Sequence, residues 1–250
     1  MSHESIIQWT DGTASFFTGC SIKSSACANC YAPPISARLA SFGQESYEGV
    51  TSKNEKGVLY FNGKIKPNLK AAENVIKVKK PKKIFVNSMS DIWHENAPIS
   101  YQKKALELMN QYDHHTYLIL SKRTENIERI LEETGMPLPK NTWIGATVEG
   151  DVIDVETKLN VKYRIDHIRN VDEALVRFLS VEPMVGPLHF DDSDLVNVNW
   201  IIIGGESGHN ARPFHLEWCR NLIENIDDIA QRLNQKIAIF VKQPGRDNFF

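Results

Sequence analysis

The sequence lacks several features that would assign it to a familiar class. No apolar run approaches the about 20 residues of a membrane-spanning helix, and the start, Met1-Ser2-His3-Glu4, does not look like a signal peptide. Neither a Gly-Lys-Ser/Thr phosphate loop nor a Gly-x-Gly-x-x-Gly dinucleotide fingerprint occurs. The net charge of −2 gives no overall basic field that would indicate nucleic acid binding. We therefore expect a cytoplasmic protein without membrane contact, whose function lies in local motifs.

Cysteine is also scarce, but its distribution is uneven. Three of the four cysteines, Cys20, Cys27 and Cys30, lie in one Gly- and Ser-rich segment and span only eleven residues. The fourth, Cys219, lies far downstream. An odd number of clustered cysteines with no signal peptide argues against a disulfide framework. Three thiols so close together in sequence indicate a metal site instead.

The number of ligands selects the metal. Structural zinc takes four closed ligands, usually from two Cys-x-x-Cys pairs or one pair with two spaced histidines, and only one such pair is present here. Three cysteines on a cubane iron–sulfur cluster leave one iron open for a small molecule that binds through an amine and a carboxylate. The sequence therefore predicts a [4Fe-4S] cluster held by Cys20, Cys27 and Cys30, with S-adenosylmethionine (SAM) as second cofactor. The alternative is a non-catalytic zinc-binding module that acts through a partner protein.

The chain as a whole is typical of a globular protein, with 250 residues, 42% of them hydrophobic and 9% aromatic. We predict a single α/β domain over residues 1–250, with a first strand at 5–9, a helix at 35–42 and a small insertion around 43–83. An Asn62-Gly63 turn predicts a hairpin within this insertion. A lysine run closes it, at Lys77, Lys79, Lys80, Lys82 and Lys83. This run is either a phosphate contact or, the interpretation we favour, a solvated edge before a strand.

From residue 84 onward the sequence repeats one plan. Short apolar runs cover residues 84–86, 117–120, 143–146, 176–179, 200–203 and 237–241, and each ends in polar residues. Amphipathic stretches with helical spacing lie between most of them, at 101–112, 126–133 and 216–233. This β-α alternation predicts a partial (β/α) barrel of about six to seven parallel strands. An open doubly wound sheet is the alternative.

Polar groups follow every one of these runs, and in parallel α/β folds the carboxyl ends of the strands carry the site. The Gly204-Gly205-Glu206-Ser207-Gly208 segment lets the backbone approach a ligand closely. Arg212, just beyond it, could hold a carboxylate or a phosphate, or pair with a surface acid. We expect His94 to be structural rather than catalytic.

Together these motifs resemble one known family. They are Thr18-Gly19-Cys20-x6-Cys27-x2-Cys30-Tyr31-Ala32, Phe85-Val86-Asn87-Ser88-Met89-Ser90-Asp91, Leu120-Ser121-Lys122-Arg123, Thr147-Val148-Glu149, Ser180-Val181-Glu182-Pro183, Gly204-Gly205-Glu206-Ser207-Gly208 and Lys242-Gln243. The combination resembles the phage- and mobile-element-associated three-cysteine family, which is radical-SAM-like, over nearly the whole chain. The wider radical SAM superfamily differs in its Cys-x3-Cys-x2-Cys spacing, with an aromatic residue where this chain has Asn29, and in a Gly-Gly-Glu segment on the second strand.

The resemblance implies a role for each strand end. The roles are, in chain order, Ser88, Ser90 and Asp91 for the amino group of SAM, Lys122 or Arg123 for its carboxylate, Thr147 and Glu149 for the ribose with Ser180 and Glu182 nearby, and Gly204, Gly205, Glu206 and Ser207 for adenine or substrate. It further implies cleavage of SAM to a 5′-deoxyadenosyl radical, with an electron donor protein as partner. We expect a nucleic acid or nucleotide-like substrate, and the sequence assigns no catalytic residue.

Overall fold

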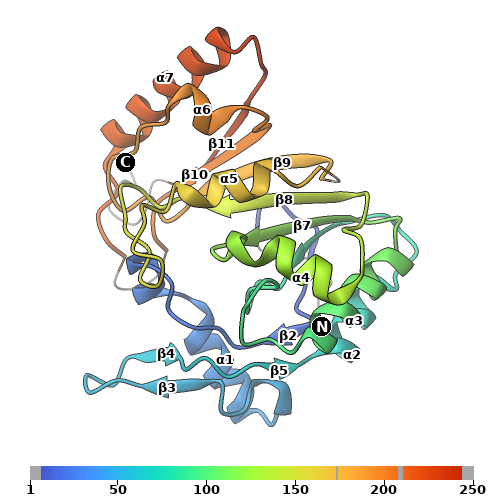
Figure 1. Ribbon diagram of the computed structural model, residues 1–250. Coiled ribbons are helices and arrows are strands. Elements are labelled where there is room, and N and C mark those ends of the chain that lie inside the picture. Colours follow the sequence, from blue (N-terminus) through green and yellow to red (C-terminus); the bar gives the residue numbers. More distant parts are fainter. Residues whose placement is uncertain (1–6, 173, 208–210, 244–250) are drawn as a thin grey trace. The chain divides into compact units, whose positions relative to one another are not determined.

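The computed structural model describes residues 7–172, 174–207 and 211–243 (Figure 1). The chain divides into two compact units, which we describe separately. Unit 1 comprises Met1–Ile22, Cys30–Trp143 and Glu173–Leu175, and unit 2 comprises Lys23–Asn29, Ile144–Asp172 and Val176–Phe250. The cysteine segment therefore contributes to both, with Cys20 and Cys30 in unit 1 and Cys27 in unit 2.

Seven strands form one sheet in the order β1-β6-β7-β8-β9-β10-β11. They are β1 (Gly12–Ala14), β6 (Lys83–Val86), β7 (Thr116–Ser121), β8 (Thr142–Thr147), β9 (Val176–Val181), β10 (Trp200–Gly204) and β11 (Ala238–Gln243). The pairs β1–β6, β6–β7, β9–β10 and β10–β11 are parallel. The order never reverses, as it would at the switch point of a doubly wound sheet, and seven strands are fewer than a closed barrel needs. The predicted partial (β/α) barrel is confirmed.

The apolar runs predicted as strands form the buried strands of the sheet. Tyr117, Leu118 and Ile119 of β7 and Ile201, Ile202 and Ile203 of β10 have no exposed surface. Parallel strands covered on both faces show continuous apolar runs of this kind rather than alternation. For the same reason the predicted bounds of these strands agree with the observed ones to within about two residues.

In unit 1, the helices α2 (Leu69–Ile76), α3 (Ile99–Gln111) and α4 (Ile127–Thr134) pack in sequence order, since α2 contacts β1 and α3, and α3 contacts α4. A short 3-10 helix, η3 (Thr124–Asn126), leads into α4. The predicted helices at 101–112 and 126–133 are confirmed in α3 and α4. Gly135, at φ +62°, ends α4 in the left-handed conformation that commonly ends helices.

Unit 1 also contains a subdomain that packs around α1 (Ala32–Ser41), the helix predicted at 35–42. Its other elements are β2 (Phe17–Thr18), η2 (Glu45–Tyr47), β3 (Thr51–Lys53), β4 (Leu59–Phe61) and β5 (Lys66–Pro67). Figure 1 shows β3 and β4 as an antiparallel hairpin beside α1, while β2 pairs with β5. A buried apolar cluster joins these parts, made of Ala32, Tyr47, Val50, Phe61 and Met89.

The hairpin predicted at Asn62-Gly63 is wrong. The observed turn lies at Asn54–Gly57, where the Asn54 Oδ1 atom accepts hydrogen bonds from the N–H groups of Lys56 and Val58. Such an Asx turn positions the chain without an Asn-Gly pair. Gly63 instead donates its N–H to the carbonyl of Cys20 at 2.9 Å, so this turn supports the cysteine segment.

The first strand predicted at 5–9 is also wrong. Residues 7–9 form a turn, in which the N–H of Thr10 donates to the carbonyl of Ile7, and Ser5 and Ile6 lie outside the described residues. The sheet begins instead at Gly12–Ala14, whose small residues show no apolar run. Asp11 fixes the register there, because its carboxylate accepts the N–H of Lys83 at the start of β6.

In unit 2, η1 (Ser25–Asn29) carries Cys27, α5 (Tyr163–Arg169) contacts β9, and α6 (Asp192–Leu195) packs on α7 (Leu216–Arg232), as Figure 1 shows. The predicted helix at 216–233 is confirmed in α7. Its buried face includes Cys219, Leu222, Ile226 and Ile229, so the fourth cysteine is a core residue.

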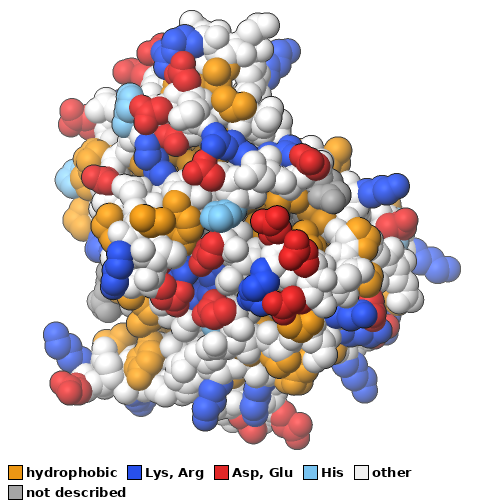
Figure 2. All heavy atoms as spheres, in the orientation of Figure 1, with side chains coloured by type: hydrophobic (Ala, Val, Ile, Leu, Met, Phe, Trp, Pro, Cys, Tyr) orange, Lys and Arg blue, Asp and Glu red, His pale blue; other side chains and the backbone are white. Residues whose placement is uncertain are grey.

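The face drawn in Figure 2 shows no dominant charge. On this face, Lys and Arg side chains are interspersed with Asp and Glu. The lysine run at 77–83 leads into the amino end of β6, whereas Ser88, Ser90 and Asp91 follow its carboxyl end. Lys77, Lys79, Lys80 and Lys83 are exposed, which fits a solvated edge. Within the described ranges, no helix combines the length and apolar character needed to cross a bilayer.

A glycine in β8 tests the packing of unit 2. An added Cβ at Gly145 would lie 2.5 Å from the Phe178 ring of β9. Gly145→Ala is therefore expected to lower the free energy of unfolding by about 2 kcal/mol through overpacking, measured by urea denaturation. Gly186→Ala is the matched control, since its added Cβ meets nothing within 4 Å. Equal stability of the two variants would contradict the packing described.

Candidate functional site

Cys20 and Cys30 are fixed on unit 1 by the apolar cluster. Both are partly buried and pack against its residues. Gly19, directly before Cys20, has φ +89°, and an added Cβ there would lie 2.0 Å from the carbonyl oxygen of Lys64, so only glycine fits. The hydroxyl of Ser90 donates to the Gly19 carbonyl at 2.5 Å, and Gly19 and Ser90 form a parallel bridge.

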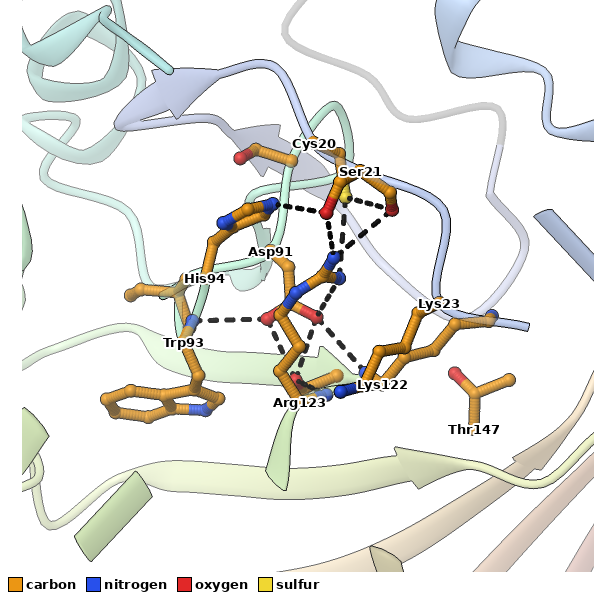
Figure 3. A network of polar contacts seen from close by, with 12 residues as sticks. Cys20, Ser21, Lys23, Asp91, Trp93, His94, Lys122, Arg123 and Thr147 are labelled. Carbon is orange, nitrogen blue, oxygen red and sulfur yellow. Dashed lines mark hydrogen bonds and ion pairs between the residues drawn. The ribbon is translucent and has the colours of Figure 1, made fainter. Parts of the chain in front are cut away.

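Next to Cys20, a buried arginine joins the strand ends of unit 1 to the cysteine segment (Figure 3). Arg123 is 1% exposed; its Nε donates to Glu95 at 2.8 Å, its Nη2 donates to the hydroxyl of Ser21 at 2.6 Å, and its Nη1 lies 3.6 Å from the Sγ of Cys20. Asp91 balances this charge from 3.7 Å. The guanidinium that the resemblance implies for the SAM carboxylate thus has internal partners.

Asp91 is itself held firmly. Its carboxylate accepts hydrogen bonds from the Ser121 hydroxyl at 2.8 and 2.9 Å, from the Lys122 N–H at 3.1 Å and from the Trp93 N–H at 3.1 Å. Donors from two successive strand ends therefore converge on one acid, as the parallel arrangement predicts. The carbonyl of Ser88 accepts the hydroxyl of Tyr31, the residue after Cys30.

Ser21 is held from a second side by His94. The Nδ1 of this fully buried histidine accepts the N–H of Asn96 at 3.0 Å, which leaves the proton on Nε2. Nε2 lies 3.1 Å from the Ser21 hydroxyl and donates to it. His94 is thus buried and hydrogen-bonded within unit 1, and its structural role stays a prediction.

In unit 2, the middle of the cysteine segment binds the polar end of β8. The hydroxyl of Ser24 donates to the carboxylate of Glu149 at 2.6 Å, and both residues are fully buried. Lys23, 1% exposed, donates to Glu156 at 2.6 Å and lies 3.7 Å from Asp154. The N–H of Lys23 donates to the Sγ of Cys27 at 3.5 Å, so the chain itself supplies a donor to this thiol.

Arg164 of α5 is the centre of this second network. It is fully buried and donates to Glu149 at 3.1 Å, to Asp154 at 2.9 Å and to the Thr147 carbonyl at 2.9 Å. Burial alone would raise the pKa of Asp154, but Arg164, the N–H groups of Thr157 and Glu156, and Lys23 together lower that pKa to about 2. The carboxylate of Asp154 is thus kept ionised beside the buried cations Arg164 and Lys23.

The last strand ends of unit 2 form two further ion pairs. Glu206, after β10, accepts Arg212 through both oxygens, at 2.6 and 3.0 Å, and also the side-chain amide of Asn29 at 2.9 Å. Burial would raise the pKa of Glu206, but these hydrogen bonds outweigh it and hold the pKa below its usual value. Lys242 donates to Glu182 at 2.6 Å. Arg212 therefore pairs with a buried acid, not a surface one.

The remaining predicted site residues lie at or just after the carboxyl ends of strands β8, β9 and β10. Thr147 and Ser180 are buried, Gly204 and Gly205 are buried at the end of β10, and Ser207 is exposed. In unit 1, Asp91 lies next to Arg123, and Ser90 binds the carbonyl of Gly19. In unit 2, Glu149 and Glu206 each bind the cysteine segment. The predicted binding roles of all these residues stay predictions.

Sequence analysis missed Arg164, Asp154, Glu95 and the anchoring role of Ser21 and Ser24. A signal existed for Arg164, because it shares a helical face with Val161, Ile165 and Ile168, all buried. A charged residue on an apolar stripe indicates a buried ion pair. No local signal identifies its partners, which come from other parts of the chain.

The donor set of the cysteine segment suits an iron–sulfur cluster chemically. None of the four cysteines, all of which the structure describes, forms a disulfide. Cys20 and Cys27 each have a nitrogen donor near the sulfur, the kind of contact that stabilises metal-bound thiolates. Among residues 7–172, 174–207 and 211–243, no group of three or more His, Cys, Asp or Glu side chains is arranged to hold a metal ion.

Comparison with known families decides the relationship. The model of one family, described as "Protein of unknown function (DUF5131)", matches residues 4–248. The chain belongs to the DUF5131 family. No curated protein matches the sequence. The phage association implied by the sequence resemblance stays a prediction for this DUF5131 member.

Solved structures of spore photoproduct lyase, a radical SAM enzyme, share its fold. The lyase complexed with dinucleoside spore photoproduct is 10% identical with a TM-score of 0.56, covering 96% of this chain and 79% of that chain. A cysteine-to-serine mutant is 11% identical with a TM-score of 0.58 over 97% and 80%. A double mutant with bound AdoMet and dinucleoside spore photoproduct is 11% identical with a TM-score of 0.57 over 95% and 78%. The predicted radical SAM-like partial barrel is thereby confirmed.

Asp154 should dominate the acid stability of unit 2. Asp154→Asn is expected to lower the free energy of unfolding at pH 7 by about 3 kcal/mol, because it removes one of the two buried carboxylates that pair with Arg164 and the buried carboxylate nearest Lys23. Since the folded-state pKa of Asp154, about 2, lies below its usual value of 3.8, the wild type should lose stability as the pH falls through this window. Urea denaturation between pH 7 and 2 measures both effects.

The matched control is Asp227→Asn on the exposed side of α7. It should change stability by no more than about 0.5 kcal/mol and keep the acid-dependent loss. An Asp154→Asn variant with the stability and pH profile of the wild type would show that the network does not stabilise unit 2.

Proposed function

We propose that this protein is a radical SAM enzyme that binds a [4Fe-4S] cluster through Cys20, Cys27 and Cys30. One observation carries the proposal: three cysteines of an eleven-residue segment, none of them in a disulfide, occur in a chain with the fold of a radical SAM enzyme. Three thiolates leave one iron of a cubane open, which is the ligand count that SAM binding requires. When bound, the cluster supplies one electron to the sulfonium of SAM, giving methionine and a 5′-deoxyadenosyl radical.

Within unit 1, Ser88, Ser90 and Lys122 are the residues we propose for the amino-acid part of SAM. The hydroxyls of Ser88 and Ser90 have acceptor lone pairs for an ammonium group. Of the two cations that the resemblance implies for the carboxylate, we assign Lys122, which directly follows the carboxyl end of β7 and whose backbone N–H donates to Asp91. Asp91 then orients Lys122, because its carboxylate accepts a hydrogen bond from the backbone N–H of Lys122.

The substrate we propose is a nucleic acid or nucleotide-like molecule. Two of the structural neighbours described above are complexes with dinucleoside spore photoproduct. In unit 2, Thr147 and Ser180 are the hydroxyl-bearing residues proposed near the ribose of SAM, with Gly204, Gly205 and Ser207 for adenine or substrate. We also propose an electron donor protein as partner, because the chemistry consumes one electron per SAM.

Iron binding tests the proposal directly. After anaerobic reconstitution, the wild type should contain about four irons and four sulfides per chain. The dithionite-reduced protein should give a cubane electron paramagnetic resonance signal that changes when SAM is added. Replacing Cys20, Cys27 or Cys30 by alanine should abolish the site, because each cysteine supplies one ligand. The control is Cys219→Ala, since Cys219 lies in the core of α7, and it should keep the iron.

Stoichiometric zinc without a cluster after the same reconstitution would refute the radical SAM proposal. It would leave the non-catalytic zinc-binding module that acts through a partner protein. A cluster whose electron paramagnetic resonance signal does not change when SAM is added would refute the proposal that one iron is open to SAM.

SAM affinity tests the assignment of Lys122. Lys122→Met is expected to weaken SAM binding by about 10- to 150-fold, because a charged hydrogen bond to the carboxylate is worth about 1.5–3 kcal/mol. Isothermal titration calorimetry of the reconstituted protein measures this. Lys104→Met, on the exposed face of α3 and paired with Glu107, is the control and should bind SAM like the wild type. Unchanged affinity in Lys122→Met would show that Lys122 does not bind the carboxylate of SAM.

A further inference from the structure

Arg123 has a geometry that its charge alone does not require. Its Nε donates to Glu95 at 2.8 Å, its Nη2 donates to the hydroxyl and carbonyl of Ser21 at 2.6 and 3.1 Å, and its Nη1 approaches the Sγ of Cys20 to 3.6 Å (Figure 3). All three nitrogens of the guanidinium are thus engaged, and two of them face the cysteine segment. A planar fork can hold a backbone carbonyl, a hydroxyl and a sulfur at once, which a lysine ammonium cannot do in the same way.

The surroundings fix this fork from behind. Asp91 lies 3.7 Å from Nη1 and is locked by donors from Ser121, Lys122 and Trp93. The Ser21 hydroxyl accepts from Arg123 and from Nε2 of the buried His94, which fills both of its acceptor positions. Cys20 is therefore positioned through its neighbour Ser21 and, at its own sulfur, by a permanent cation.

A cation or an N–H donor beside a cluster thiolate changes the reduction potential of the cluster in a known direction. The reduced cluster carries one more negative charge than the oxidised cluster, so a nearby positive charge stabilises the reduced form and raises the reduction potential. The effect is enhanced at a site 1% exposed to solvent, since water screens it little. The same contact restrains the position of the cysteine backbone.

We propose that Arg123 is the positioning residue of Cys20, and that it makes the cluster bound through this cysteine easier to reduce. The tuning part rests on the proposed function, because it requires that a cluster is bound. The positioning part does not, since the contacts exist within the chain alone.

The test uses Arg123→Gln and Arg123→Lys in the full chain. In the reconstituted enzyme, the midpoint potential of the cluster, measured by anaerobic redox titration with electron paramagnetic resonance, should shift to a more negative value in Arg123→Gln. Arg123→Lys keeps the charge and should restore most of the wild-type potential. A purely structural arginine would not show this rescue. Arg129→Gln, an exposed pair partner of Glu133 on α4, is the control and should leave the potential unchanged.

Hydrogen exchange of the protein without metal tests the positioning part. Peptides that cover Cys20 and Ser21 should exchange about tenfold faster in Arg123→Gln, because a hydrogen bond to a charged group worth about 1.5 kcal/mol is lost. Arg123→Lys should also exchange faster, since it lacks the fork, and it remains available if Arg123→Gln does not fold. Wild-type exchange in a folded variant would overturn the positioning role.

The outcomes separate the two proposals. A wild-type protein that binds no cluster refutes the proposed function and the tuning role, while the exchange data still decide the positioning role. A loaded Arg123→Gln with the wild-type potential overturns the tuning role and leaves the proposed function intact.

Discussion

A buried charge is stable only beside a counter-charge, and this requirement holds the cysteine segment in place in each unit. In unit 1, Arg123 is neutralised by Asp91 and Glu95 and extends its remaining donors to Ser21 and Cys20. In unit 2, Arg164 is neutralised by Glu149 and Asp154, and Glu149 accepts the hydroxyl of Ser24. Removing one partner from such a pair costs about 3–5 kcal/mol, so these networks resist rearrangement.

The strands and helices could be predicted because their signals are local. A buried parallel strand needs a continuous apolar run, and β7 and β10 show one. The first strand could not be predicted, since Gly12–Ala14 is short, small and held by its pairing with β6. The hairpin prediction was wrong because Asn62-Gly63 and the Asx turn at Asn54 are both good turns, and only the tertiary contact of Gly63 with Cys20 separates them.

The candidate site was predictable in position but not in pairing. That polar groups would gather at strand ends follows from the parallel fold, and Asp91, Arg123, Glu149 and Glu206 are all found there. Their partners could not be predicted, because Ser21, Ser24 and Asn29 are distant in sequence and hydroxyls and amides give no charge signal. Several side chains to which the resemblance gives a role in SAM binding also contact the cysteine segment of their own unit.

The spacing of the cysteines explains why so many anchors are needed. Six residues separate Cys20 from Cys27, and a longer loop has more conformations to lose when its ends are fixed. Three of these six residues are tied down within their own unit, Ser21 by Arg123, Lys23 by Glu156 and Ser24 by Glu149. Each anchor removes part of the conformational freedom of the loop, so less ordering entropy would oppose binding of the proposed cluster. The long gap and the buried ionic networks are thus parts of one arrangement, in which the strand ends preorganise the loop that carries the thiols.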